Sequence, residues 1–393
     1  MTWLIRFCAL VSTFVFFLVF IMAAKAAGPI VIGLDADMSS GSARSGQSIK
    51  RGAELAIDEI NNSGGVLGRK LKLQIRDHRG NPSRGVDNIV EFSGMANVVA
   101  VIGGLHTPVA LHELEAIHTN KMLYLGPWAA GTPIVNNGYQ PNYVFRVSVR
   151  DEFAGGYLVE QALKRGHKRI ALLLENTGWG RSNERAMKKA LYRRDMDPAG
   201  LAWFHWGPTD IQAALDDLEK SQPDVILLVA NAPEGLALIR AMAKRPKEKR
   251  IPILSHWGIS GGEFASQAKN ILNEVDLLLL QTFSFLDPVF PGKSDQFVTA
   301  YTARYPNVFS ARDIIAPVGA AHAYDLVYLL AKAIEKAGTI NRPAVRDAME
   351  NLDKYNGLVR VYDPAFTATR HDALGVEDFR MARFAEDGTI VPQ

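Results

Sequence analysis

Three loops of this chain place a tryptophan next to glycine, proline or histidine, directly after a short apolar run. They are Gly126-Pro-Trp128, Gly178-Trp179-Gly180 and His256-Trp257-Gly258. Tryptophan buries a large flat area and keeps one N–H group for a hydrogen bond, so it suits the wall of a ligand pocket. Each of the three could also pack in a core. Because loops beyond strand ends usually face solvent, we favour contact with an apolar or aromatic ligand.

A fourth loop, Gly103-Gly-Leu-His-Thr107-Pro108, ends another apolar run. Threonine is a good N-cap and proline a good first residue of a helix. The start of such a helix offers free N–H groups and a partial positive charge, which suit a carboxylate or another acceptor. We therefore expect the Thr107 hydroxyl to contact a ligand, although a cap without any further role explains the same residues.

One segment matches a catalytic motif. Gly258-Ile-Ser260-Gly-Gly262 fits the Gly-x-Ser-x-Gly pattern of a hydrolase nucleophile, and His322 and His371 follow it. Ser260 also precedes Glu263 by three positions, which is the spacing of a helix capping box. A cap needs no partner elsewhere in the chain, whereas a catalytic triad needs two. We favour the cap and expect no enzyme activity, with an exported hydrolase as the least favoured class.

Composition excludes several other functions. The nine histidines form no metal-ligand pattern, and no phosphate loop or dinucleotide-binding glycine motif is present, so we expect neither a metal nor a cofactor. The net charge of +3 gives no sign of nucleic-acid binding. The basic run Lys244–Arg250 contains a proline and joins a predicted helix to a predicted strand, so we interpret it as a solvated connection rather than a phosphate or membrane patch.

The first residues predict export. The run from Phe7 to Met22 is apolar apart from Ser12 and Thr13, and Ala24-Lys-Ala26 supplies small residues where a signal peptidase cleaves. We expect residues 1–26 to be a cleaved signal peptide and the mature protein to be periplasmic, with a retained anchor as the alternative. The single cysteine, Cys8, lies inside this segment, so the mature protein would contain none.

Strand-like and helix-like segments alternate along the rest of the chain, which predicts an α/β fold with parallel sheets covered on both faces. Two such series of similar length indicate two similar lobes. They are followed by a long helix at Val318–Lys336 and a short strand-rich tail at Leu358–Val391. The expected strands are Pro29–Leu34, Leu71–Ile75, Asn97–Ile102, Met122–Leu125, Ile170–Leu174, Leu201–His205, Val225–Val229, Ile251–Ser255 and Leu277–Leu280. Helices are expected between them, among others at Asn183–Arg194, Asp210–Lys220 and Glu234–Lys244.

Several blocks of sequence carry a family resemblance through their order and spacing. They are Gly52–Asn61 with Gly64–Gly68, Ala100–Gly103, Tyr143–Arg146, Val318–Asp325 and Ala344–Ala348. From about residue 28 to its end, the chain resembles the solute-binding proteins of branched-chain amino acid ABC transporters, the Leu/Ile/Val-binding family. The resemblance implies the type I periplasmic binding protein fold, in which two doubly wound parallel-sheet lobes are joined by three hinge crossings.

The same resemblance implies where the chain divides. The crossings would fall near Arg146–Val149, Leu280–Phe283 and Gly357–Arg360. Lobe 1 would then comprise residues 27–147 and 283–357, and lobe 2 residues 148–282 and 358–393.

The ligand residues of the family transfer only in part. Thr107 corresponds to the hydroxyl that binds a ligand carboxylate, but Ala129 and Ala130 stand where the family usually carries a side-chain hydroxyl. Trp179 replaces the usual tyrosine. The acid that pairs with a ligand ammonium falls near Trp257, and no Asp or Glu lies between residues 251 and 262. A buried ammonium without a counter-charge is costly, so a free amino acid is disfavoured unless Glu175 or Glu234 supplies the charge.

We therefore expect the extracytoplasmic substrate-binding component of an ABC transporter, which closes its lobes on an aromatic, amide-like or apolar ligand. The alternatives are an amino acid ligand, branched-chain or other, and a periplasmic sensor subunit. The expected partner is an inner-membrane permease, and we expect a monomer that does not bind nucleic acid. The candidate ligand-binding residues are Ser40, Thr107, Trp128, Ala129, Ala130, Trp179, Asn231 and Trp257.

Overall fold

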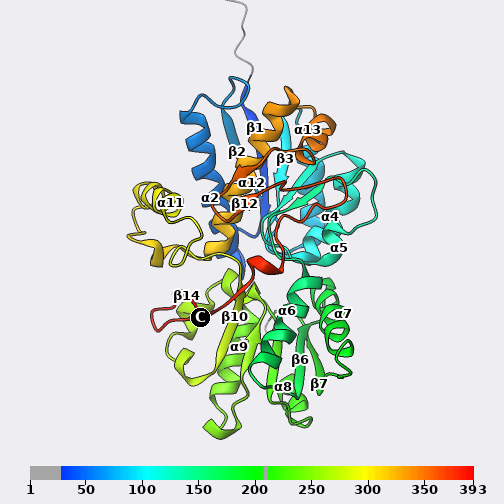
Figure 1. Cartoon of the computed structure of the whole chain (residues 1–393), viewed down its shortest axis with the longest axis vertical. Helices are drawn as coiled ribbons and strands as arrows, with labels where there is room; N and C mark the ends of the chain where they lie inside the picture. The colour runs from blue at the N-terminus through cyan, green and yellow to red at the C-terminus, as the bar shows by residue number, and fades with distance from the viewer. Residues whose placement is uncertain (1–27, 208–210) are drawn as a thin grey trace, which may run out of the picture.

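The molecule consists of two α/β bodies stacked along its longest axis (Figure 1). The computed structural model describes residues 28–207 and 211–393. The expected signal peptide lies outside these residues. We call the body around the first sheet lobe 1 and the body around the second sheet lobe 2.

Lobe 1 is built on a five-stranded parallel sheet with the order β2-β1-β3-β4-β5. Helix α2 packs against α12, and α3 packs against α4. The strands are β1 (Ile30–Ala36), β2 (Leu71–Asp77), β3 (Val98–Ile102), β4 (Leu123–Gly126) and β5 (Val144–Arg146). The helices are α2 (Ala43–Asn62), α3 (Pro82–Ser93), α4 (Thr107–Thr119), α5 (Thr132–Val135), α11 (Pro291–Arg304), α12 (Pro317–Ala337) and α13 (Arg342–Met349), and the hairpin of β11 (Tyr355–Asn356) and β12 (Val361–Tyr362) completes the lobe.

Lobe 2 is built on a seven-stranded sheet with the order β14-β13-β10-β9-β8-β6-β7. Its strands from β10 to β7 are parallel, and β13 and β14 add antiparallel. The strands are β6 (Ile170–Glu175), β7 (Gly200–Phe204), β8 (Val225–Val229), β9 (Ile253–Ser255), β10 (Leu277–Gln281), β13 (Arg380–Phe384) and β14 (Ile390–Pro392). The helices are α6 (Asp151–Lys164), α7 (Gly178–Tyr192), α8 (Ile211–Glu219), α9 (Ala232–Ala243) and α10 (Phe264–Ala268).

The central strands explain why both sheets are parallel. Strands β3 and β8 have the sequences VVAVI and VILLV, and every one of their residues is buried. Such continuous apolar runs suit strands that are covered by helices on both faces, which is how the lobes form. Both lobes and the strand positions expected from the sequence are therefore confirmed, and the fold is that of the type I periplasmic binding proteins.

Close helix packing in lobe 1 depends on a glycine. Gly52 of α2 faces the backbone of α12, and a Cβ atom there would lie 2.0 Å from the carbonyl oxygen of Ala320. Helix α12 ends where Gly338 adopts a φ of 64°, a left-handed C-cap that favours glycine. These contacts fix α2 and α12 as one layer of lobe 1.

The chain passes between the two sheets three times. The first passage joins β5 to α6 and the second follows β10, both where the sequence predicts them. The third differs from the prediction near Gly357–Arg360. Leu358 and Val359 donate their N–H groups to the Asp325 carboxylate of α12 at 2.7 and 2.9 Å, which holds this segment on lobe 1. Residue Asp372 still bridges to β5, so the chain enters the second sheet only at β13.

Helix α7 begins five residues before its predicted start at Asn183, because the Thr177 hydroxyl caps it by accepting a hydrogen bond from the N–H of Trp179. Among residues 28–207 and 211–393, we find no helix with the length and apolar character that crossing a membrane requires.

Candidate functional site

A cavity of about 650 Å³ lies between the two lobes. The residues that follow β1, β2 and β3 line it from lobe 1, and those that follow β7 and β8 line it from lobe 2. Ligands in doubly wound folds bind beyond the carboxyl ends of the strands, and here the strand ends of two sheets meet. The lining residues are Asp37, Ser40, Gly41, Ser42, Arg79, Gly80, His106, Trp206, Gly207, Ile211, Asn231, Pro233, Glu234, Leu236, Ala237, Arg240 and Gln267.

Asp37 shapes the lobe 1 wall. Its carboxylate accepts hydrogen bonds from the N–H groups of Ser40 and Ser42, at 2.8 and 3.0 Å. It also accepts the Ser40 hydroxyl proton at 2.5 Å. Ser40 therefore lines the cavity as the sequence suggests, while its hydroxyl donates to Asp37 and holds the loop after β1 in a tight turn.

Glu175 organises the lobe 2 wall from behind. This side chain is fully buried at the end of β6. One carboxyl oxygen, Oε2, accepts the indole N–H of Trp206 at 2.8 Å and the amide N–H of Asn231 at 3.1 Å, and the other accepts the Thr177 hydroxyl. Burial raises the pKa of Glu175 to about 8, and the nearby carboxylates of Glu234 and Asp151 act in the same direction. Glu175 is therefore mostly protonated at neutral pH.

Asn231 and Glu234 begin helix α9 and face the cavity. They are only 4% and 5% exposed. One carboxyl oxygen of Glu234 accepts the N–H of Gly207 at 3.0 Å. Within the described chain, the other oxygen of Glu234 and the amide oxygen of Asn231 have no hydrogen-bond partner. Burial also raises the pKa of Glu234.

The two walls meet at an aromatic contact. His106 of lobe 1 and Trp206 of lobe 2 are in edge contact, with ring centroids 5.1 Å apart. Burial lowers the pKa of His106 to about 4, so its ring is neutral at physiological pH. This part of the cavity is therefore flat, uncharged and largely apolar.

The three tryptophans singled out in the sequence lie in the lobe–lobe contact. Trp128 of lobe 1 packs on Trp257 of lobe 2 with ring centroids 5.9 Å apart, and Trp257 also contacts His322. Trp179 donates its indole N–H to Asp151 at 3.2 Å. All three are at most 5% exposed, and none of them is among the described residues that line the cavity.

The remaining predicted ligand residues lie in the same contact. Thr107 is the first residue of α4 rather than its N-cap, which is His106. The predicted capping role of Thr107 is therefore wrong, because its hydroxyl oxygen accepts the N–H of Gly131 at 3.1 Å. The backbone N–H of Ala129 donates to Gly104, and the carbonyl of Ala130 accepts the N–H of Asp151. These groups hold the loops after β3 and β4 together.

The capping box predicted for Ser260 and Glu263 does not form. Ser260 lies inside the 3₁₀ turn Trp257–Gly261, and its hydroxyl donates to the Trp257 carbonyl at 2.6 Å. Glu263 instead pairs with Arg44 of lobe 1 at 2.5 Å.

The histidines of the alternative hydrolase triad are engaged elsewhere. The Nδ1 atom of His322 lies 2.8 Å from the Pro127 carbonyl, and that of His371 lies 2.8 Å from the Val144 carbonyl. Ser260 and these histidines are thus tied to separate backbone groups.

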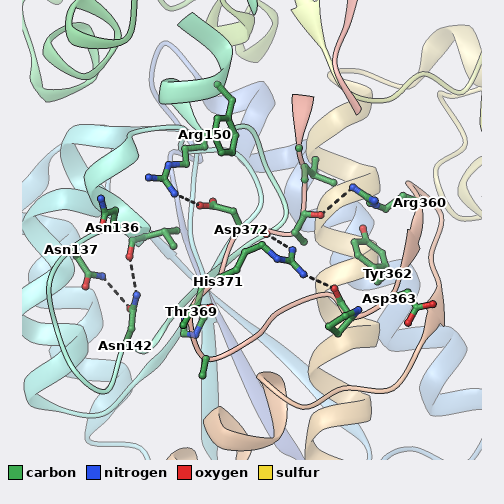
Figure 2. Close-up of a pocket in the computed structure, with 18 of the residues that line it drawn as sticks. Asn136, Asn137, Asn142, Arg150, Arg360, Tyr362, Asp363, Thr369, His371 and Asp372 are labelled. Carbon is green, nitrogen blue, oxygen red and sulfur yellow. Dashed lines mark hydrogen bonds and ion pairs between the residues drawn. The ribbon is translucent and has the colours of Figure 1, made fainter. Parts of the chain in front are cut away.

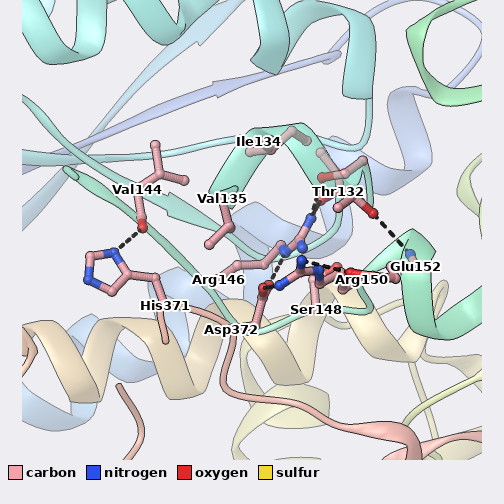
Figure 3. A network of polar contacts seen from close by, with 12 residues as sticks. Thr132, Ile134, Val135, Val144, Arg146, Ser148, Arg150, Glu152, His371 and Asp372 are labelled. Carbon is pink, nitrogen blue, oxygen red and sulfur yellow. Dashed lines mark hydrogen bonds and ion pairs between the residues drawn. The ribbon is translucent and has the colours of Figure 1, made fainter. Parts of the chain in front are cut away.

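A second cavity of about 650 Å³ lies between the loop after α5 and the segment 360–377 (Figure 2). Figure 2 shows Arg150 and Asp372 pointing toward one another on its wall. Beneath them, the fully buried Arg146 donates from Nε to Asp372 at 2.6 Å (Figure 3). Arg146 Nη1 also donates to the carbonyls of Ala129 and Gly131 at 3.2 and 2.9 Å. This network joins the first and third passages to the loop that carries Trp128.

Comparison with known proteins agrees with this architecture. A family model described as "Periplasmic binding protein" matches residues 29–389. The chain belongs to the periplasmic binding protein family. Members of this family are solute-binding proteins rather than enzymes.

Individual members resemble the chain along most of its length. It is 26% identical to the Leu/Ile/Val-binding protein BraC3 of Rhizobium johnstonii, over 79% of this chain and 80% of that protein. A periplasmic binding protein type 1 from Bordetella pertussis Tohama I superimposes with a TM-score of 0.83 at 21% identity, covering 93% of this chain and all of that one. A solute binding protein of an ABC transporter from R. palustris, in complex with 4-hydroxybenzoate, has a TM-score of 0.77 at 18% identity over 93% and 95% of the two chains.

Sequence reasoning did not include two residues of the cavity wall, His106 and Trp206, among the candidates. Trp206 follows strand β7 as the three chosen tryptophans follow theirs, so its position was a usable signal. Glu234 was considered only as a possible counter-charge. Of the eight candidate residues, Ser40 and Asn231 line the cavity, and the other six lie in the closed lobe–lobe contact.

Proposed function

We propose that this protein is the extracytoplasmic receptor of an ABC transporter and that its solute binds in the cavity between the lobes. The observation that carries the proposal is the composition of the cavity wall, which comes from the carboxyl-terminal strand ends of both sheets. A solute there touches both lobes at once, so its binding free energy favours the closed arrangement.

Closure has a structural basis in contacts that join the lobes. The N–H of Thr132 donates to the Ser182 hydroxyl at 3.1 Å, and Arg312 pairs with Asp387 at 2.7 Å. The packing of Trp128 on Trp257 belongs to the same set. In an open form these partners separate and the tryptophans become exposed to water. A permease that recognises the closed shape would then receive only loaded receptors.

The solute we expect is aromatic, amide-like or apolar. Trp206, His106 and Leu236 give the cavity its apolar walls, and Trp257 occupies the position where amino acid binders of the family carry an acid. The R. palustris neighbour was solved with an aromatic acid, which supports a ligand of this kind.

An amino acid is the second candidate, because Glu234 places a carboxyl group in the cavity and a relative is named for leucine, isoleucine and valine. A periplasmic sensor would use the same closure. Neighbouring permease and ATPase genes would favour transport, and a neighbouring kinase gene would favour sensing.

Native mass spectrometry of the protein purified from its own periplasm tests the receptor function directly. We expect a retained small molecule, and small-angle scattering should show a more compact protein when that molecule is present. Calorimetry with the twenty amino acids separates the two ligand classes. Tight binding of leucine, isoleucine or valine would replace the aromatic or amide-like assignment, and a protein whose dimensions respond to no solute would overturn the receptor function.

The variant Trp257→Glu restores an acid where the amino acid binders have one. We expect it to weaken the natural solute, because a carboxylate would then be buried beside Trp128 and His322. Trp203→Phe is the matched control, since Trp203 lies on the outer strand β7 and stacks with Arg181. Equal solute affinity in Trp257→Glu and the wild type would exclude Trp257 from the ligand contact.

A further inference from the structure

The first turn of α9 carries two residues that helices normally use as caps. Asn231 is the N-cap residue and Glu234 stands three positions later, which is the arrangement of a capping box. Neither residue is used in this way. The Asn231 side chain caps no helical N–H, and the Glu234 carboxyl accepts from Gly207 instead. Both side chains are turned toward the cavity.

Glu175 determines which atom of Asn231 faces the cavity. The Asn231 amide nitrogen donates to Glu175 Oε2, the oxygen that also accepts the Trp206 indole N–H. The oxygen and nitrogen of an amide lie on opposite sides of one planar group. With its nitrogen held by Glu175, Asn231 presents its oxygen to the cavity, and that oxygen meets no partner in the described residues.

The free oxygen of Glu234 gives the cavity a second acceptor of the same kind. Buried polar atoms are nearly always hydrogen-bonded in folded proteins, so two unpartnered acceptors on one cavity wall indicate a missing donor. Leu236 and Trp206 supply apolar surface on the same wall.

We propose that the solute carries a nitrogen group whose N–H donors are accepted by Glu234 Oε2 and Asn231 Oδ1, and that Glu175 is the residue that positions Asn231 for this contact. The proposal rests on the proposed function and names the chemistry of its ligand. A neutral carboxamide and a charged amidinium or ammonium group share this donor chemistry, whereas a carboxylate offers only acceptors to the same two oxygens.

Benzamide, benzamidine and benzoate form a matched set of probes, because they share one ring and differ only in the polar group. Ligand-observed NMR on the full-length mature protein detects even weak binding. We expect benzamide and benzamidine to bind at least about tenfold more tightly than benzoate, since a site built for donors rejects an analogue without them. Tighter binding of benzoate, or no binding of any of the three, would overturn the proposal. Benzamide stronger than benzamidine would identify a neutral ligand, and the reverse order a cationic one.

Substitutions at the two acceptors assign the effect. Glu234→Gln removes the negative charge and offers donors, so benzamidine should lose about tenfold in affinity while benzoate gains. Asn231→Leu should weaken benzamide and benzamidine alike. Glu335→Gln, at an exposed position of α12, is the matched control and should leave all three affinities unchanged. An unchanged order of affinities in Glu234→Gln would contradict the proposed contact, provided that its thermal unfolding matches that of the wild type.

Two variants test the positioning role of Glu175. Glu175→Gln keeps an acceptor for Trp206 and Asn231, so the preference for benzamide over benzoate should remain. Glu175→Leu removes that acceptor and frees the Asn231 amide to turn its nitrogen into the cavity, so the preference should shrink or reverse. A purely structural role would weaken all probes equally.

Small-angle scattering separates failure of this inference from failure of the receptor function. Closure on benzoate without closure on benzamide would overturn the nitrogen-donor ligand and keep the receptor. If neither these probes nor the molecule retained from the periplasm closes the lobes, both proposals are wrong.

Discussion

Arg146 and Asp372 form a buried ion pair across the base of the hinge, with 2.6 Å between Nε and Oδ1. Arg146 ends β5, where the chain leaves lobe 1, and Asp372 belongs to the segment by which the chain leaves it for the last time. Two backbone hydrogen bonds flank the pair, from the N–H of Arg146 to His371 and from the N–H of Ala373 to Arg146. The first and third passages are therefore fastened to each other at one point.

Removing the charge of Asp372 should be strongly destabilising. In Asp372→Asn, the Arg146 guanidinium stays buried without its counter-charge, and we expect a loss of about 3–5 kcal/mol in the free energy of unfolding. Urea titration followed by circular dichroism measures this loss. Asp347→Asn is the control, because it breaks an ion pair with Arg346 at a position that is 69% exposed, and should cost at most about 1 kcal/mol. Similar losses in the two variants would show that the hinge pair contributes little.

The stability of the protein should fall as the pH rises from mildly acidic to mildly alkaline. Glu175 has a pKa of about 8 in the folded protein and 4.5 when unfolded, so the folded state holds a proton that the unfolded state releases between these values. Stability from this group is complete below about pH 4.5 and is lost as the pH approaches 8. Glu175→Gln should flatten this slope, with a gain at pH 8 on the order of a few kcal/mol. Parallel slopes for variant and wild type in urea titrations would contradict the shifted pKa.

Adding one methyl group between α2 and α12 should destabilise lobe 1. The Cβ of Gly52→Ala would lie 2.0 Å from the Ala320 carbonyl oxygen, so the two helices must separate, at a cost of about 1–3 kcal/mol. Gly156→Ala, in the interior of α6, has nothing within 4 Å of its new Cβ and should stabilise the protein by about 0.5–1 kcal/mol. Thermal unfolding of the two variants should therefore shift in opposite directions.

Ser260→Ala should affect stability and nothing else. It deletes the hydrogen bond to the Trp257 carbonyl, which is worth about 0.5–1.5 kcal/mol. Screening the wild type against ester and amide substrates should give no turnover. Turnover that Ser260→Ala abolishes would restore the hydrolase alternative.

Local sequence patterns predicted the elements of the fold well and their polar contacts poorly. The apolar runs of β3 and β8 identify central parallel strands, since nothing outside the strand is needed to recognise them. The capping boxes at Ser260 and Asn231 both fit the pattern and neither forms. In each case the glutamate finds a partner far away in sequence, Arg44 for Glu263 and Gly207 for Glu234.

The same limit applies to the candidate site. The loops after β4, β6 and β9 end at the edge of the sheets as predicted, but whether Trp128 faces solvent or Trp257 depends on the position of the other lobe. No local pattern contains that position. Burial of Glu175, which raises its pKa, likewise depends on Trp206 and Asn231 from two other strand ends.

The unused caps of α9 have a consequence for how this receptor can change over evolutionary time. A helix that begins without help from the Asn231 side chain loses little when that residue is replaced. The same holds for Glu234, whose carboxyl holds a neighbouring loop rather than its own helix. Ligand preference can therefore be altered at these two positions by single substitutions that leave the lobe intact. Related receptors are free to diverge in what they capture while their scaffold stays the same.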